Sequence, residues 1–347
     1  MKKIIQLFFL VISIKIMSQG EVITTDFNWP LGLAKSEQFL FIAEANDNKI
    51  SKIDLTDQSN TPEDVITGLS RPLYLEISGD YLYFTEGNSG TITKINFTES
   101  NPAPEVVIAG LDDLQDLLLV GNELYYTEYS LGKISKIDIT ENNPTPILIA
   151  DNLFTPFGLE IYDGELYFSE YIENRISKID LGNPGSSPIP VLNGLGGPIG
   201  GMQFNGSELY FFQYSDNKFS KVDISLANPV VELVDDVLSG GDILFDNTDI
   251  YTSDFENDSI IKYPDELILS INSLNFDSIT VFPNPSIDYI RLEGIKDTTE
   301  YQIYDIFGRL IQDGVTNNFQ HINLSYISSG RYFIHIENSA ITSFLKN

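Results

Sequence analysis

Short apolar runs separated by turn residues fill the chain from residue 21 to about residue 264, and no stretch keeps a helical periodicity. Residues 156–195 show the pattern most clearly, with the runs PFGLEIY, ELYFSEY, NRISKID and IPVLNGL. Turn-forming sequences such as Asp163-Gly164 and Asn183-Pro184-Gly185 separate these runs. The pattern predicts groups of four short β-strands.

This group of four strands recurs along the chain. The pentapeptide ISKID occurs at residues 50–54, 134–138 and 176–180, and six copies, variants included, align on lysines 41 to 43 residues apart: Lys52, Lys94, Lys136, Lys178, Lys221 and Lys262. Four strands in about 42 residues is the size of one propeller blade, whereas the rungs of a β-solenoid are usually shorter. We therefore predict an all-β fold with a six-bladed β-propeller over residues 21–268. Residues 21–27 resemble the end of the other units, so we expect them to complete the sixth blade and close the ring.

Eight residues before each lysine stands an acidic or amide residue: Glu44, Glu86, Glu128, Glu170, Gln213 and Asp254. Both positions flank the same hairpin in every unit, and catalysis does not need six copies of a pair. The repetition predicts a structural contact between acid and lysine, within or between blades. An exposed pair of this kind contributes only ~0–1 kcal/mol to stability.

The pattern changes near the end of the chain. After an expected linker at residues 269–278, short strands of alternating polarity predict a small Ig-like β-sandwich over residues 279–347. An Ig-like binding module is one interpretation of this segment.

Several motifs in this segment favour a more specific interpretation. They are the box Pro283-Asn284-Pro285, the turn glycine Gly308 after a strand, the pair Gly330 and Tyr332, and the basic residue Lys346 near the end. In this order they resemble the type A C-terminal sorting domain of the Bacteroidetes type IX secretion system, although Arg331 stands where that family usually has Ile, Val or Met. The resemblance implies that an outer-membrane translocon recognises the domain. It also implies that the domain is commonly removed afterwards, leaving the passenger released or attached to surface lipopolysaccharide.

The first residues predict a secretory signal peptide over residues 1–18. Lys2 and Lys3 precede the apolar run 4–14, and small or polar residues follow from Ser18. The run is too short for a good membrane span and is followed by Lys15, and no later stretch is apolar enough to be transmembrane. Together with the sorting motifs, this predicts a protein that is exported to the periplasm and then secreted or displayed on the outer cell surface.

Composition excludes several kinds of chemistry. The chain has no cysteine, which excludes disulfides, thiolate nucleophiles and a lipid-modified cysteine. Residues 19–271 hold 42 acidic and 12 basic residues of a chain whose net charge is −30, and this acidic protein is not expected to bind nucleic acid. The two histidines, His321 and His335, lie in the sorting segment. The propeller therefore has no histidine general base and no Ser-His-Asp arrangement, and we assign no catalytic residue.

The blades themselves resemble a broad group of propellers. Sequences such as YFTEGNSGTITKIN and YFSEYIENRISKID are similar to NHL-type repeats, YWTD propellers, gluconolactonase-like propellers and virginiamycin B lyase, although that lyase depends on a histidine that this propeller lacks. Because the group contains both enzymes and binding platforms, the resemblance does not choose between them.

The gluconolactonase-like members of this group hold a divalent cation in the central channel. The equivalent channel positions are here Gly32, Tyr74, Asp116, Gly158, Gly200 and Asp242. Asp116 and Asp242 belong to opposite blades and are the metal candidates. Oxygen ligands suit Ca²⁺, the one cofactor considered.

A second pattern indicates ligand binding. The residue after the repeated acid is aromatic in four consecutive units, as Tyr129, Tyr171, Tyr214 and Phe255. These turns share a face with the loops that enter the channel, so the rings are expected near Gln115 and Phe157. Aromatic rings with polar groups suit sugars and peptides, but they also commonly pack between blades.

Two hypotheses about function follow. The first is a secreted or cell-surface binding protein whose ligand is a glycan, a peptide or a protein. The alternative is a metal-dependent hydrolase or lactonase with a divalent cation in the channel.

Overall fold

The computed structural model describes residues 20–57, 59–183, 186–237, 239–246, 249–264, 280–282, 286–293, 299–305, 309–317, 320–336 and 341–346. The chain divides into two compact units, Met1–Ile268 and Leu269–Asn347, and each is considered by itself. The predicted signal peptide, the predicted linker, Pro283-Asn284-Pro285 and Gly308 lie outside the described residues.

The described part of the first unit contains six four-stranded antiparallel sheets, which are the six predicted blades. Blade one consists of β2 (Pro30–Ser36), β3 (Phe39–Glu44), β4 (Lys49–Asp54) and β5 (Glu63–Thr67). Blade two consists of β6 (Pro72–Ser78), β7 (Tyr81–Glu86), β8 (Thr91–Asn96) and β9 (Glu105–Ala109). Blade three consists of β10 (Leu114–Val120), β11 (Glu123–Glu128), β12 (Lys133–Asp138) and β13 (Ile147–Ala150). Blades four and five are β14 (Pro156–Tyr162), β15 (Glu165–Glu170), β16 (Arg175–Asp180) and β17 (Ile189–Asn193); and β18 (Pro198–Asn205), β19 (Glu208–Gln213), β20 (Lys218–Asp223) and β21 (Glu232–Asp236). A short 3₁₀ turn, η1 (Tyr214–Asp216), joins β19 to β20.

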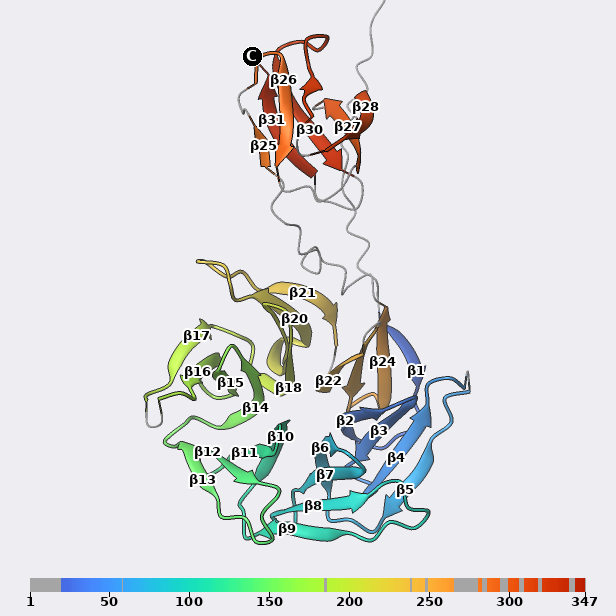
Figure 1. The fold of residues 1–347 in the computed structure, drawn as a ribbon. Helices are drawn as coiled ribbons and strands as arrows, with labels where there is room; N and C mark the ends of the chain where they lie inside the picture. The colour runs from blue at the N-terminus through green and yellow to red at the C-terminus, as the bar shows by residue number, and fades with distance from the viewer. Residues whose placement is uncertain are drawn as a thin grey trace, which may run out of the picture. The chain divides into compact units, whose positions relative to one another are not determined.

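The sixth blade joins the two ends of the unit. It consists of β22 (Gly240–Asp246), β23 (Asp249–Asp254), β24 (Ser259–Pro264) and β1 (Glu21–Thr24), and β1 pairs with β24 so that Glu21 lies opposite Lys262. The predicted closure of the ring is therefore confirmed. Figure 1 shows the six sheets around a common axis, with the first strand of each blade innermost.

Hydroxyl side chains fasten the inner strands to one another. Each inner strand shows a register shift after its first or second residue, as between Leu114 and Leu117, and such an irregularity leaves a backbone N–H without its ladder partner. In blade three, the Asp116 N–H donates to Thr127 Oγ1, which in turn donates to the carbonyl of Phe157 in blade four, at 3.0 and 3.2 Å. Ser253 makes the same link from blade six to blade one. Thr85, Thr127 and Ser253 each accept the N–H at the irregularity and donate to a carbonyl of the next blade. Blades one and five have Ala43 and Phe212 at this position.

The predicted contact between the repeated acid and the repeated lysine is wrong. Glu170 is buried and accepts hydrogen bonds from the Phe154 N–H, the Ser177 hydroxyl and the Arg175 guanidinium. Lys178 instead pairs with Glu165 and lies over the ring of Tyr167, with its Nζ 5.7 Å from the ring centroid. The cause is the hairpin register: Lys178 lies opposite Tyr167, three residues from Glu170 along the strand.

The described part of the second unit contains two sheets. One consists of β25 (Thr280–Phe282), β26 (Tyr289–Glu293) and β29 (Ile322–Asn323), and the other of β28 (Leu310–Thr316), β27 (Thr299–Asp305), β30 (Gly330–Ile336) and β31 (Ile341–Lys346). Both contribute to one hydrophobic cluster, which includes Leu292 from the first sheet and Ile303 and Ile334 from the second. The Ig-like sandwich stays a prediction. His321, in the same unit, stacks on Tyr289 with ring centroids 4.0 Å apart.

Replacing the repeated acid should destabilise the propeller far more than replacing the repeated lysine. Glu170→Ala leaves the Phe154 N–H, Ser177 and Arg175 without their acceptor, so we expect a loss of about 2–4 kcal/mol in the free energy of unfolding. Lys178→Ala removes only a partly exposed pair and should cost less than about 1 kcal/mol. Urea denaturation of both variants checks this, and equal losses would contradict the assignment.

Candidate ligand-binding site

In blades one to five, the loop that leads into the inner strand carries a residue in an unusual backbone conformation. Trp29, Arg71, Asp113, Thr155 and Gly197 occupy equivalent positions, 42 residues apart, and all have φ between 47° and 60°. Non-glycine residues seldom adopt this left-handed region, and such residues cluster at functional sites.

Polar groups from the preceding blade hold this conformation in place. The Trp29 N–H donates to Asp258 Oδ1 at 2.8 Å, and the Arg71 N–H donates to Asn48 Oδ1 at 3.0 Å. The residue just before Arg71 is held from its own blade, since the Ser70 N–H donates to the repeated acid Glu86 at 2.7 Å. The backbone of these loops is therefore fixed by the propeller frame.

These loops and the turns after the second strands surround one depression of about 300 Å³, which we call the aromatic bowl. All six predicted ligand-binding residues line it: Gln115, Tyr129, Phe157, Tyr171, Tyr214 and Phe255. Trp29, Arg71, Leu73 and Tyr74 contribute further lining. Residues from all six blades thus converge at one end of the channel.

The rings of the bowl contact one another. Trp29 lies 4.9 Å from Phe255, which stacks with Tyr214 at 6.1 Å, while Tyr129 meets Phe157 edge to face at 5.9 Å between ring centroids. These rings are partly exposed, apart from Phe255, which is buried. Most of these rings pack against the channel core and also line the depression, and their role in ligand binding stays a prediction.

The sequence interpretation missed Trp29 and Arg71. Their signal was available, since both stand immediately before the proline that opens an inner strand, at the same place in the repeat. Nothing in their residue types repeats from blade to blade, however, and only the aligned position reveals that they belong to one ring of loops.

Tyr74 closes the bottom of the bowl. Its side chain crosses the channel from blade two, and its hydroxyl donates to the carbonyl of Gly241 in blade six at 3.1 Å. Burial, together with the charges of Asp116 and Asp242, raises the pKa of this hydroxyl well above its usual value. Tyr74 therefore stays neutral and contributes to the floor of the aromatic bowl, beside the two channel carboxylates.

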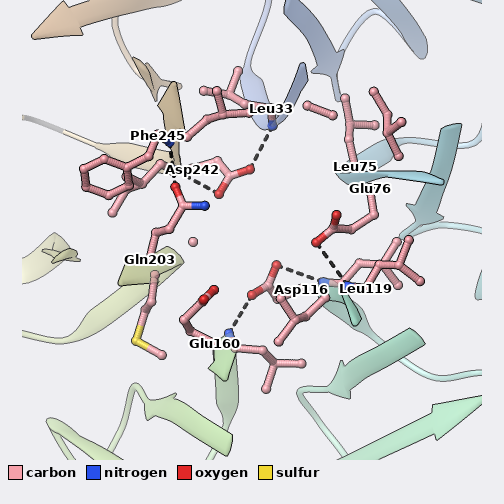
Figure 2. Close-up of a pocket in the computed structure, with 18 of the residues that line it drawn as sticks. Leu33, Leu75, Glu76, Asp116, Leu119, Glu160, Gln203, Asp242 and Phe245 are labelled. Atoms are coloured by element: carbon pink, nitrogen blue, oxygen red, sulfur yellow. Dashed lines mark hydrogen bonds between the residues drawn. The ribbon is translucent and has the colours of Figure 1, made fainter. Parts of the chain in front are cut away.

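The C-terminal halves of the inner strands line a second depression of about 530 Å³, which we call the acidic chamber. Figure 2 shows Glu76, Asp116, Glu160 and Asp242 around this chamber, together with Gln203. Most of these groups bind the backbone of the next blade. Asp116 accepts from the Leu159 N–H at 2.6 Å, Asp242 from the Leu33 N–H at 2.8 Å, and Glu76 from the Leu119 N–H at 3.2 Å.

Burial determines the protonation of these carboxyls. It raises the pKa of Glu76 to about 8 and that of Asp242 to about 7. The pKa of Asp116 rises through burial and through the charge of Asp242, and the pKa of Glu160 rises through burial and through the charge of Glu76. At neutral pH Glu76 is therefore mainly protonated and Asp242 about half protonated, so the chamber carries fewer than four negative charges.

The predicted metal residues, Asp116 and Asp242, do not fit a calcium site as they are arranged. Each carboxylate has both oxygens turned to backbone N–H groups, one of its own strand and one of the next blade. Among the described residues, no group of three or more His, Cys, Asp or Glu side chains is arranged to hold a metal ion. Calcium needs six to eight oxygen ligands, and the metal interpretation stays a prediction.

The described sorting residues lie together in the second unit. Gly330 is paired with Lys346 across β30 and β31, and the buried Tyr332 donates its hydroxyl hydrogen to the carbonyl of Ser328 at 2.9 Å. Ser286, which follows the Pro283-Asn284-Pro285 box in sequence, bonds through its N–H to the carbonyl of Leu345 at 2.8 Å. The residue after the Pro283-Asn284-Pro285 box therefore contacts β31, the last strand of the segment.

Comparison with known families identifies this segment. Residues 280–346 match the family described as the secretion system C-terminal sorting domain. The predicted type IX sorting domain is thereby confirmed, and it implies secretion or attachment at the cell surface. In the part of the chain that the structure describes, no helix has both the length and the apolar character needed to span a membrane.

Comparison with solved structures confirms the propeller class. A gluconolactonase from Xanthomonas campestris aligns with a TM-score of 0.58 at 13% identity, covering 70% of this chain and 88% of its own. An auxiliary nutrient binding protein from Bacteroides thetaiotaomicron gives 0.56 at 14%, with 68% and 69% covered, and virginiamycin B lyase from Staphylococcus aureus gives 0.52 at 18%, with 70% and 97% covered. At these identities the likeness concerns the fold alone. A search of curated proteins found no match to this chain.

The acidic chamber makes stability depend on pH. The raised pKa of Glu76 means that the folded protein keeps a proton that the unfolded chain releases above its ordinary pKa of 4.5. The contribution of this group to stability is therefore lost as pH rises from about 4.5 to about 8. Glu76→Gln keeps an acceptor for the Leu119 N–H, as Gln203 does for the Phe245 N–H at 2.7 Å, and no longer titrates.

Between pH 5 and pH 9, the free energy of unfolding should fall less in Glu76→Gln than in the parent protein. We expect the two decreases to differ by about 1 kcal/mol or more. Urea denaturation across this range measures the difference. Glu63→Gln, at an exposed carboxylate, is the control and should follow the parent curve. A parent-like slope for Glu76→Gln would show that Glu76 does not titrate as described.

Proposed function

We propose that this protein is a secreted or surface-displayed binding protein whose propeller takes its ligand in the aromatic bowl. The observation that carries the proposal is the convergence of rings from separate blades on one open depression, beside Trp29 and Arg71, whose backbone has the left-handed conformation. Partly exposed rings with polar groups beside them bind sugars, peptides and protein surfaces well. The ligand is accordingly a glycan, a peptide or a segment of a protein.

The sorting domain supports the proposal that binding occurs outside the cell. A protein exported by the type IX translocon meets its ligand outside the cell, as a nutrient-binding or surface-recognition protein does. In this proposal the signal peptide at residues 1–18 directs the first export step. The domain at residues 279–347 then directs the second, and the propeller at residues 21–268 carries the binding activity.

The hydrolase or lactonase hypothesis has less support from the geometry. Its metal candidates, Asp116 and Asp242, hold the inner strands together through backbone hydrogen bonds. The aromatic bowl, in contrast, offers a depression in which most of the rings are partly exposed. Binding without chemical conversion is therefore the function we propose.

The export role of the sorting domain can be tested by truncation. In a host with a type IX secretion system, the full-length protein should reach the medium or the cell surface. A version lacking residues 280–347 should accumulate in the periplasm, which fractionation and immunoblotting will show. Periplasmic retention of both versions would contradict the proposed export route.

The bowl can be tested by truncating its rings. Tyr171→Ala and Tyr214→Ala should each weaken binding to a ligand identified on a glycan and peptide array by about tenfold or more, because central aromatic contacts carry most of the binding energy. Tyr81→Ala is the matched control, since this half-exposed tyrosine lies beside Lys94 and does not line the bowl. Equal affinity for all variants by calorimetry would place the ligand elsewhere.

A further inference from the structure

Arg71 is exceptional among the basic residues of the propeller. Ten of the twelve basic residues between residues 19 and 271 form ion pairs in the described part of the chain, and only Lys133 and Arg71 do not. In a segment with 42 acidic residues, an arginine without a carboxylate partner needs an explanation. Its backbone N–H is held by Asn48, so the loop is fixed while the guanidinium has no partner of its own among the described residues.

Blade two leaves space for this guanidinium beside the aromatic bowl. Blade two has Gly87 where blades three to six carry a ring after the repeated acid. A Cβ at Gly87 would lie 3.6 Å from Arg71 Nη1 and 3.0 Å from the Leu73 side chain. The gap in the arc of rings therefore coincides with the arginine, and Arg71 lines the bowl together with those rings.

The other polar groups of the bowl can both donate and accept hydrogen bonds. Tyr129, Tyr171 and Tyr214 bring phenol hydroxyls, and Gln115 brings an amide whose nitrogen donates to Asp113 Oδ1 at 3.2 Å while its oxygen faces no donor among the described residues. Groups of this kind match the hydroxyls of a sugar, which also donate and accept. The rings match the apolar face of a sugar ring, and the guanidinium matches a planar carboxylate.

We propose that the bowl binds a uronic acid residue of an acidic polysaccharide, with Arg71 pairing with its carboxylate. The proposal rests on the binding function proposed above and names the class of ligand for the same site. Two rim acids keep their negative charge, but hydrogen bonds hold their carboxylates in place. Asp113 accepts from Ser130 and Gln115, and Glu256 accepts from the Tyr214 hydroxyl.

Matched probes test the proposal on the full-length protein. Calorimetry would compare oligosaccharides of galacturonic or glucuronic acid with their methyl esters, with neutral hexose oligosaccharides, and with short peptides carrying a free C-terminal carboxylate. We expect a uronate oligosaccharide to bind about 10–100-fold more tightly than its ester, since a hydrogen bond to a charged group contributes more than one to a neutral group.

Variants separate the role of Arg71 from that of the rings. Arg71→Gln should lower the affinity for the acid about 10–100-fold and leave the affinity for the ester within about twofold, while Arg71→Lys restores part of the loss. Lys133→Gln, at the other unpaired basic residue, is the control and should bind the acid like the parent protein. Thermal melts confirm that each variant is folded.

The outcomes distinguish this inference from the proposed function. Equal binding of acid and ester, or an unchanged affinity in Arg71→Gln, overturns the uronate proposal. If a neutral glycan binds and depends on Tyr171 and Tyr214, the binding function stands without an anionic ligand. Preference for the peptide carboxylate overturns the sugar and makes a peptide the ligand class. If the protein binds none of these probes, the uronate proposal is overturned, and the binding function is then decided by the glycan and peptide array proposed above.

Discussion

The buried acid at the end of each second strand determines how the rest of the propeller is built. In blades one to five, its side-chain oxygen accepts the N–H of the loop residue two positions before the inner strand, from Asn28 N–H to Glu44 at 3.2 Å through to Gly196 N–H to Gln213 at 2.9 Å. An unpaired backbone N–H at such a place is costly, so the loop has one favourable path. That path places the next residue, Trp29 or Arg71 among them, in the left-handed conformation at the rim of the bowl. A structural contact thereby positions the binding surface.

The channel shows what a repeated frame allows to vary. Blades three apart carry matching residues: Gly32 and Gly158, Asp116 and Asp242, and the acceptors Glu76 and Gln203. The pattern has an approximate two-fold symmetry that Tyr74 and Gly200 break. Only one bulky side chain can cross the axis, and Gly200 has no room for one, because a Cβ there would lie 2.4 Å from the carbonyl of Gly241. The floor of the channel and the lining of the bowl are therefore formed by residues that differ between blades, such as Tyr74.

The sequence predicted those features that every blade repeats. The spacing of the lysines defined the blades, the resemblance of residues 21–27 to the other fourth strands located the closure, and the aromatic residues after the acid indicated one face. It could not give the partner of a charged side chain, because Glu170 and Lys178 are close in sequence but are separated by the register of their hairpin. It also could not show that Asp116 and Asp242 bind backbone groups, since an acceptor and a metal ligand are the same residue type. Trp29 and Arg71 were missed because their importance comes from position alone.

The strong negative charge and an arginine for an anionic ligand are compatible, because the two act over different distances. At physiological ionic strength a charge is largely screened beyond about 8 Å, so most of the 42 acids of this segment scarcely influence a group inside the bowl. The net charge keeps an exported protein apart from other acidic surfaces, whereas the local field in the bowl comes from Arg71 and from its engaged acidic neighbours. Like-charge repulsion therefore acts mainly on approach, and Arg71 acts at contact. In the proposed complex, the ligand's carboxylate therefore pairs with Arg71 at short range, where most of the wider negative charge is screened.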